Sequence, residues 1–308
     1  MTIFLHILLN NVLPMMIMIV IGILLEKIFH LDIKTLSKLN FYLFSPAVIF
    51  TLLYETHIPL QQIGNTVLFF VIFMVLQYIL VELVIRARRY KPSMKSAMRN
   101  SVLFYNSANY GIPLNQLVFA GNKETLGIQI IIMMFQSLIP NTYGIYSVNR
   151  HKANMKQVWL KILSMPVIYV IPLAFAMRGF DIGIPAPIQT PLNYVSDAFI
   201  GTALLTLGVQ LGQMDWKISK SLALDVSLSG ILRLIAGPLL AWGVVTVLDI
   251  DKLLGAALIV SSAVPTSLSS VLLAVEFDNE KEFSSQAVFV STLISILTVT
   301  VVIYFLKL

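Results

Sequence analysis

Long apolar segments follow one another along the whole chain, and they constrain the fold more than any other feature of the sequence. Each segment is about as long as the roughly 20 residues that a helix needs to cross a bilayer. The runs lack the alternating pattern of strands in a membrane barrel. The sequence therefore predicts an all-α membrane protein with ten transmembrane helices, at Leu5–Phe29, Ile33–Tyr54, Asn65–Ile85, Met94–Ala120, Thr125–Tyr146, Val158–Met177, Leu192–Leu211, Ile218–Leu248, Lys252–Ala274 and Glu282–Leu306.

The composition fits a chain that faces lipid over most of its surface. Charged residues make up only 12% of the sequence, against about 25% in a soluble domain. The net charge of +6 does not indicate a nucleic-acid partner, because all but one of the lysines and arginines lie at the ends of the apolar segments or between them. Cysteine is absent, which excludes disulfides and thiolate metal sites, and we expect neither a metal nor a cofactor. Residues 1–6 lack the basic region of a signal peptide, so the first segment is expected to be retained.

Basic residues are distributed unevenly between the two sides of the predicted bundle. The connections after the odd-numbered segments, with the adjoining helix ends, hold sixteen of the 21 lysines and arginines. The opposite side, with both termini, holds four, and Arg233 lies inside a segment. Short loops rich in lysine and arginine stay in the cytoplasm. We therefore expect a multi-pass protein of the cytoplasmic (inner) membrane, with the link at 149–154 in the cytoplasm and both termini outside.

Three sequence matches recur at a spacing near 152 residues. Each half of the chain holds five segments, an odd number, so a second copy would be inverted in the membrane. Inverted repeats with helices interrupted at matching positions are typical of secondary transporters. The sequence thus predicts a five-helix repeat at 1–150 and a second, inverted repeat at 151–308, which together form one integrated membrane domain. The matches are Pro14 with Pro166, Leu39-Asn40 with Leu192-Asn193, and Pro113 with Pro265.

The fourth and ninth segments contain residues that interrupt a helix. Proline removes an amide donor from a helix, and glycine adds backbone freedom. The fourth segment contains Gly111 and Pro113, and Pro265 lies at the matching place in the ninth segment. We expect these three residues to form a crossing or hinge. Two half-helix N-termini would then point at one central locus, where their partial positive charges and free amides suit an anion. The alternative is a pair of proline kinks without a ligand.

At these residues the sequence resembles the auxin efflux carrier family. The resemblance implies ten helices with both termini outside, crossed fourth and ninth helices, a scaffold part beside a moving transport part, and homodimers. The link between the halves is short, as in compact bacterial members that resemble malate or malonate permeases, whereas plant auxin exporters carry a long loop there. The likeness spans essentially the whole chain, and the stretches that carry it are 45–47, 106–114, 207–208, 232–238, 263–265 and 275–277.

Polar residues near the two breaks are the candidates for substrate binding. Asn106 and Asn109 lie three residues apart and hence on one helix face, where they could donate to a carboxylate or satisfy freed backbone carbonyls. The resemblance implies a ligand role for Asn106 and for Gln136. The remaining candidates are Asn141, Thr266 and Ser267. Gln136 and Asn141 of the fifth segment could instead make ordinary hydrogen bonds between helices. Thr266 and Ser267 of the ninth segment could instead cap the backbone.

Three charged residues inside segments need a separate explanation, because burying a charge in a bilayer costs free energy. Arg233 either supplies positive potential for an anionic substrate or bonds the free carbonyls of a broken helix. Asp197 and Asp225 lie nearer the ends of their segments and are candidates for coupling transport to protons or sodium ions.

We therefore expect a secondary transporter that moves a small mono- or dicarboxylate by an elevator-like movement, with this anion and the lipid bilayer as its partners. A cation or proton exchanger on the same plan would need carboxylates where this chain has Asn106 and Asn109. A membrane sensor without transport would need a partner domain, for which the short loops leave no room. Nucleotide-binding loops and hydrolase motifs are absent from the sequence, so it indicates neither an ATP-driven pump nor an enzyme.

Overall fold

The computed structural model describes residues 2–148, 159–160, 162–214 and 216–308, and within these residues the chain is helical without a strand. Seven helical stretches in this described part are long and apolar enough to cross a membrane, which confirms the all-helical membrane class. They are α1 (Thr2–Ile7), η1 (Leu8–Val12) and α2 (Leu13–Phe29); α3 (Ile33–Leu39), η2 (Asn40–Phe44) and α4 (Ser45–Glu55); α5 (Leu60–Arg88); α8 (Lys123–Ile139), η3 (Pro140–Gly144) and α9 (Ile145–Val148); α12 (Ala186–Gln213); α13 (Ala223–Ile231), η4 (Leu232–Ala236) and α14 (Gly237–Val247); and α17 (Lys281–Leu306).

The other predicted segments are shorter or interrupted helices. The fourth consists of α6 (Pro92–Leu103) and α7 (Gly111–Val118), and the ninth of α15 (Lys252–Ser262) and α16 (Ser269–Glu276). The sixth is represented by α11 (Val167–Gly179), and its predicted start at Val158, like the link at 149–154, lies outside the described residues. Non-helical residues 104–110 and 263–268 thus fall where the sequence predicts the two breaks. The count of ten spans stays a prediction.

Single π-helical turns interrupt four of the long helices, and each turn begins at a proline or ends two residues before one. A proline ring clashes with the carbonyl of the preceding turn, and one extra residue in that turn relieves the clash. The same turns carry polar or charged side chains that an apolar helix would otherwise lack. Among them are Asn10 in η1, Asn40 in η2, Asn141 in η3 and Arg233 in η4.

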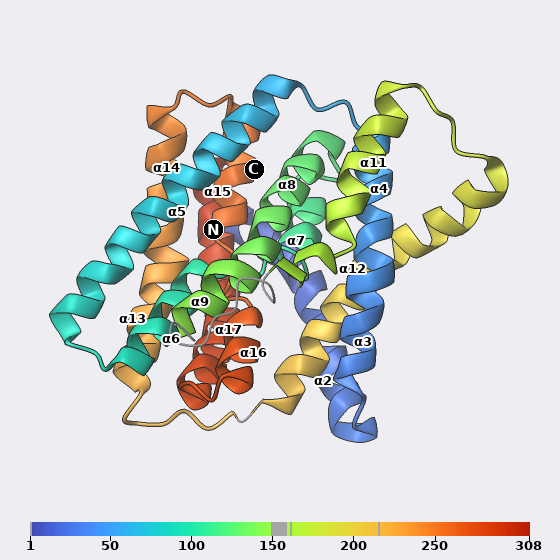
Figure 1. The fold of residues 1–308 in the computed structure, drawn as a ribbon. Coiled ribbons are helices and arrows are strands. Elements are labelled where there is room, and N and C mark those ends of the chain that lie inside the picture. Colours follow the sequence, from blue (N-terminus) through green and yellow to red (C-terminus); the bar gives the residue numbers. More distant parts are fainter. Residues whose placement is uncertain (1, 149–158, 161, 215) are drawn as a thin grey trace.

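The helices form two groups, which Figure 1 shows on opposite sides of the bundle. The lateral group comprises α2, α3, η2, α4, α11 and α12, in which α2 packs along α12 and α11 along α4. The crossing group comprises α5 to α9 and α13 to α17. Glycines allow the close approach in the lateral group, because a Cβ on Gly22 would collide with the Leu205 carbonyl, and a Cβ on Gly208 with that of Ile19.

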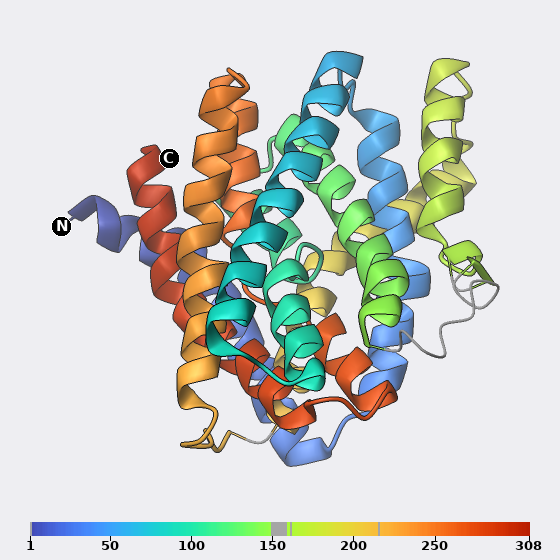
Figure 2. The same cartoon turned by 60° about the vertical axis from the view of Figure 1, so that its left-hand side comes forward.

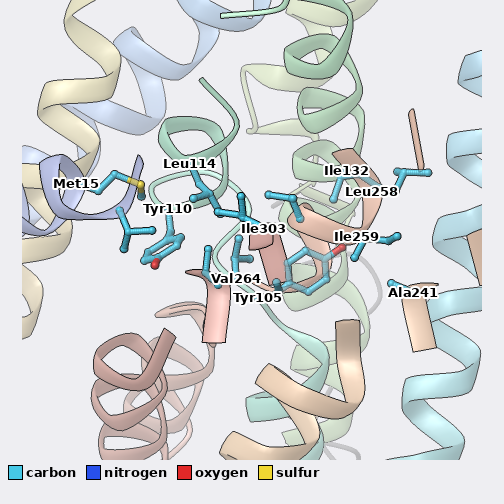
Figure 3. Packing of buried hydrophobic residues seen from close by; sticks show 14 of the residues in the cluster. Met15, Tyr105, Tyr110, Leu114, Ile132, Ala241, Leu258, Ile259, Val264 and Ile303 are labelled. Carbon is cyan, nitrogen blue, oxygen red and sulfur yellow. The ribbon is translucent and has the colours of Figure 1, made fainter. Parts of the chain in front are cut away.

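Buried apolar side chains surround the two non-helical stretches. Tyr105 and Val264, from the two stretches, belong to one cluster with Tyr110, Leu258 and Ile303 (Figure 3). The two ends of the chain lie near each other, as the turned view shows (Figure 2), and the rings of Phe4 and Tyr304 are 6.3 Å apart.

Candidate functional site

The two non-helical stretches meet and pair as an isolated antiparallel bridge. The Asn106 N–H donates to the Pro265 carbonyl at 2.9 Å, and the Ser267 N–H donates to the Phe104 carbonyl at 2.8 Å. Backbone groups that leave a helix inside a membrane must find other partners. Here each stretch supplies the partners of the other, and this meeting of 104–110 with 263–268 is called the crossing below.

Two predicted ligand residues hold the backbone of the crossing. The Gln136 Oε1 accepts a hydrogen bond from the Tyr105 N–H at 3.2 Å, and its Nε2 donates to the Leu103 carbonyl at 3.3 Å. The Thr266 hydroxyl donates to the Ser101 carbonyl at 2.7 Å and is fully buried. Gln136 still borders the cavity described next, whereas Thr266 does not. Their bonds match the structural alternatives stated for both residues.

Arg233, in η4, lies beside the C-terminal ends of α6 and α15, and it is 0% exposed. Its guanidinium donates to the Val102 carbonyl at 3.1 Å, to the Ser262 carbonyl, and to the Gln77 Oε1 at 3.0 Å. It also lies over the ring of Tyr105, 4.5 Å from the centroid. The last carbonyls of a helix lack intrahelical partners and carry partial negative charge. One buried cation therefore donates hydrogen bonds to carbonyls at two helix C-termini. It does not border the cavity described next.

A cavity of about 450 Å³ lies between the lateral group and the crossing group. Five of the six residues predicted to bind substrate line it together: Asn106, Asn109, Gln136, Asn141 and Ser267. The other described residues that line it are Ser37, Lys38, Asn40, Phe41, Tyr42, Ser45, Pro46, Ile49, Tyr105, Ser107, Ala108, Met133, Ser137, Pro166, Val167, Thr206, Gln210, Leu268, Ser269 and Leu272. We call this space the crossing cavity.

The five residues differ in how free their side chains are. The Asn141 amide donates to the Ser137 carbonyl at 2.8 Å within its own helix, and the Ser267 hydroxyl accepts from the Ser269 N–H at the start of α16. The side chains of Asn106 and Asn109 make no hydrogen bond to another described residue, although Asn106 is only 8% exposed. Its amide atoms are not among the fully buried polar atoms without a partner, so they reach the cavity that Asn106 lines. The Asn106 amide is therefore the group best placed to gain from a ligand.

The charge around this cavity is positive. Lys38 is the one charged residue among its described lining residues, and no carboxylate is found there. The stretches that lead into α7 and α16 both border the cavity, and the N-terminus of a helix favours an anion. Within the described part of the chain no three histidine, aspartate or glutamate side chains gather as metal ligands would. The lining thus suits a small anion with hydrogen-bond acceptors.

The predicted hinge residues have roles that differ from a helix kink. Pro113 is the third residue of α7, where an amide would lack an intrahelical partner in any case, so the break precedes it. Gly111 begins α7, and a Cβ there would collide with the side-chain amide of Gln129, which donates to the Ser107 carbonyl at 2.7 Å. Gly111 therefore provides space for a bond, and Pro265 supplies an acceptor within the crossing.

The lateral wall of the cavity is polar, which the sequence analysis did not predict. The Asn40 amide donates to the Thr206 hydroxyl at 2.5 Å, and the Gln210 amide donates to the Ser37 hydroxyl at 3.4 Å. Thr206 and Gln210 lie one turn apart on α12 and face the residues from α3 and η2. The available signal was the spacing of polar residues at i and i+4 within an apolar helix.

The two aspartates lie apart from the crossing cavity. Asp225 accepts hydrogen bonds from Tyr90 at 2.5 Å and from Arg88 at 3.2 Å. Burial, and then the bond to Asp225, raise the pKa of Tyr90 to about 12, so its hydroxyl remains a donor at neutral pH. Asp197 is exposed and lines a second cavity. A buried carboxylate that the sequence analysis missed is Glu26 in α2, whose Oε2 has no partner among the described residues.

Comparison with known proteins identifies the family of the chain. The sequence matches the family described as "Membrane transport protein" over residues 7–303. An "uncharacterized transporter" of Methanothermobacter thermautotrophicus is 24% identical over 297 residues, which are 94% of this chain and 95% of the relative. The family match covers both non-helical stretches and the cavity between the groups. The chain therefore belongs to the membrane transport protein family, the auxin efflux carrier family that its two crossing motifs resemble.

Proposed function

We propose that the protein is a secondary transporter that carries a small mono- or dicarboxylate across the cytoplasmic membrane. The observation that carries the proposal is the amide of Asn106, which has no hydrogen-bond partner among the described residues and lines a cavity. One lysine and no acid is found among the described lining residues of that cavity. An anion in this cavity would accept from the Asn106 amide and meet the N-terminal ends of α7 and α16. Asn109 and Ser267 would complete the binding site, whereas Asn141 and Gln136 line the cavity with amides that already bond backbone groups.

The arrangement of two groups supports an elevator-like mechanism. The proposed ligand residues Asn106, Asn109 and Ser267 belong to the crossing group, and the cavity separates them from α3, α4 and α12 of the lateral group. A rigid shift of the crossing group against the lateral group would carry the bound anion across the bilayer. This mechanism rests on ten spans in two inverted repeats, with both termini outside and the Lys38 end of the cavity toward the cytoplasm.

The rival functions make different demands on the same site. A cation or proton exchanger needs an acid where the ion binds, and the described lining of the crossing cavity has none. The candidates for ion coupling, Asp197 and Asp225, lie elsewhere, and Asp225 is paired with Arg88. A sensor without transport would bind a ligand without moving it. Uptake of labelled carboxylates into proteoliposomes separates the proposed transporter from both rivals, and cation exchange in the same vesicles separates the exchanger from the sensor.

Substitution of Asn106 tests the site itself. Asn106→Ala should raise the apparent KM for the transported anion about ten- to a hundredfold, because a hydrogen bond to a charged group contributes about 1.5–3 kcal/mol. Asn106→Asp should abolish anion uptake by repulsion, whereas a cation exchanger would keep or gain activity.

The matched control for this test is Asn141→Ala, whose amide is already bonded to the Ser137 carbonyl within the helix. We expect it to change the KM far less. Equal effects of the two alanine variants, or unchanged transport by Asn106→Ala, would remove Asn106 from the binding site.

A further inference from the structure

A second cavity, of about 460 Å³, lies between the same two groups but away from the crossing. It borders no described residue of 104–110 or 263–268. Its polar and charged lining residues come from the ends of helices that the predicted orientation places outside. These residues are Thr51 and Glu55 of α4, Gln116 of α7, Lys123 of α8, and Asn193, Ser196 and Asp197 of α12. We call this space the outer cavity.

An ion pair joins the two groups at the outer cavity. The Lys123 Nζ lies 2.8 Å from the Glu55 Oε2, so the first residue of α8 in the crossing group contacts the last residue of α4 in the lateral group. Among the described residues, four other ion pairs lie within the crossing group, and they would not change if that group moved as a rigid body. They are Arg86–Glu82, Arg88–Asp225, Arg99–Glu82 and Lys281–Asp278.

Both charges of this pair lie at helix ends that disfavour them. A cation is unfavourable at the N-terminus of a helix, where Lys123 begins α8, and an anion is unfavourable at the C-terminus, where Glu55 ends α4. Local helix electrostatics would therefore place the opposite charges at these positions. The pair stabilises each charge by the other, and this stabilisation exists only while the two groups are in register.

We propose that the Lys123–Glu55 pair is a latch that keeps the outer end of the interface closed while Asn106 faces the crossing cavity. The inference rests on the proposed transport function and adds a regulator of its conformational step. When the crossing group shifts toward the outside, Lys123 moves away from Glu55 and the outer cavity widens. The side chains are 58% and 35% exposed, so the pair is weak. Breaking it should shift the equilibrium between the two states by about two- to fivefold.

Thiol labelling measures this shift without any substrate. The natural chain has no cysteine, and Ser196, which lines the outer cavity and is 8% exposed, provides a single labelling site as Ser196→Cys. In detergent, Lys123→Gln and Glu55→Gln should each raise its rate of reaction with a maleimide about two- to fivefold. The double variant should react no faster than either single one, and the charge swap Glu55→Lys with Lys123→Glu should restore the slow rate. Unchanged rates, or additive effects, would overturn the latch.

Cross-linking tests whether the pair must open during transport. A reversible bifunctional thiosulfonate should join Glu55→Cys to Lys123→Cys and stop uptake, and a reductant should restore it. The control is Asp278→Cys with Lys281→Cys, a pair within the crossing group, whose cross-link should leave uptake intact. Normal uptake by the cross-linked Glu55–Lys123 variant would refute the proposal. Because the labelling assay needs no transported anion, failure to find a substrate would leave the latch separately testable.

Discussion

Replacement of Arg233 tests whether one buried cation holds the two broken helices together. In Arg233→Ala the carbonyls of Val102 and Ser262 lose their donor, and both lie in a site that excludes water. A buried acceptor without a partner costs about 1–3 kcal/mol, so the two together cost about 2–6 kcal/mol. Loss of the contact with the Tyr105 ring adds to this. We therefore expect the melting temperature in detergent to fall by about 5 °C or more.

Arg233→Lys distinguishes a structural role from a purely electrostatic one. Lysine keeps the charge but has a single nitrogen, whereas the guanidinium reaches Val102 and Ser262 through two different nitrogens. A structural role predicts that lysine loses stability and transport nearly as badly as alanine. The control is Arg99→Lys, which keeps a charge beside Glu82 and should change the melting temperature little. A fully stable and active Arg233→Ala, or a lysine variant equal to the wild type, would refute the reasoning.

Further predictions concern the packing of the crossing, the lateral group and the topology. Gly111→Ala should displace the Gln129 amide from the Ser107 carbonyl and lower the melting temperature, while Gly179→Ala, which has open space beside it, should not. Gly208→Ala should strongly reduce the yield of folded protein in a detergent-stability screen, because α2 cannot move away from α12 without loss of packing. Alkaline phosphatase fused after Leu308 should be active, and a silent fusion there with an active one at 154 would overturn the orientation.

The helices and the places where they break could be predicted from sequence, because both depend on local chemistry. Apolar length sets the spans. Pro265 lies within one observed break, and Gly111 and Pro113 lie in the first turn of the helix that follows the other. The exact position of a break could not be predicted in the same way. Pro113 falls in the first turn of α7, where it is tolerated, and the preceding helix ends earlier, where Phe104, Tyr105 and Asn106 pair with the other stretch.

The roles of individual polar residues depend on contacts between distant segments, which a single sequence does not reveal. Gln136 and Thr266 both lie beside the crossing, as expected, but their polar atoms bond backbone groups. Asn40 and Thr206 meet across 166 residues, so the i, i+4 spacing of Thr206 and Gln210 could indicate a polar face on α12 but not the partner of that face. The carbonyl partners of Arg233 were easier to predict, because a cation buried in a membrane near free carbonyls has few other partners.

The two breaks produce two chemically opposite environments a short distance apart. At the C-terminal ends of α6 and α15 the free carbonyls gather, and Arg233 neutralises them in a fully buried place. At the N-terminal ends of α7 and α16 the partial charge is positive, and Asn106 faces an open cavity without a described acid. If Arg233 did not compensate the carbonyl ends, their negative potential would oppose the anion that the amide ends favour. In the proposed anion site the buried arginine would therefore favour binding without contact, because it compensates the carbonyl ends and leaves the positive helix ends uncompensated at the cavity.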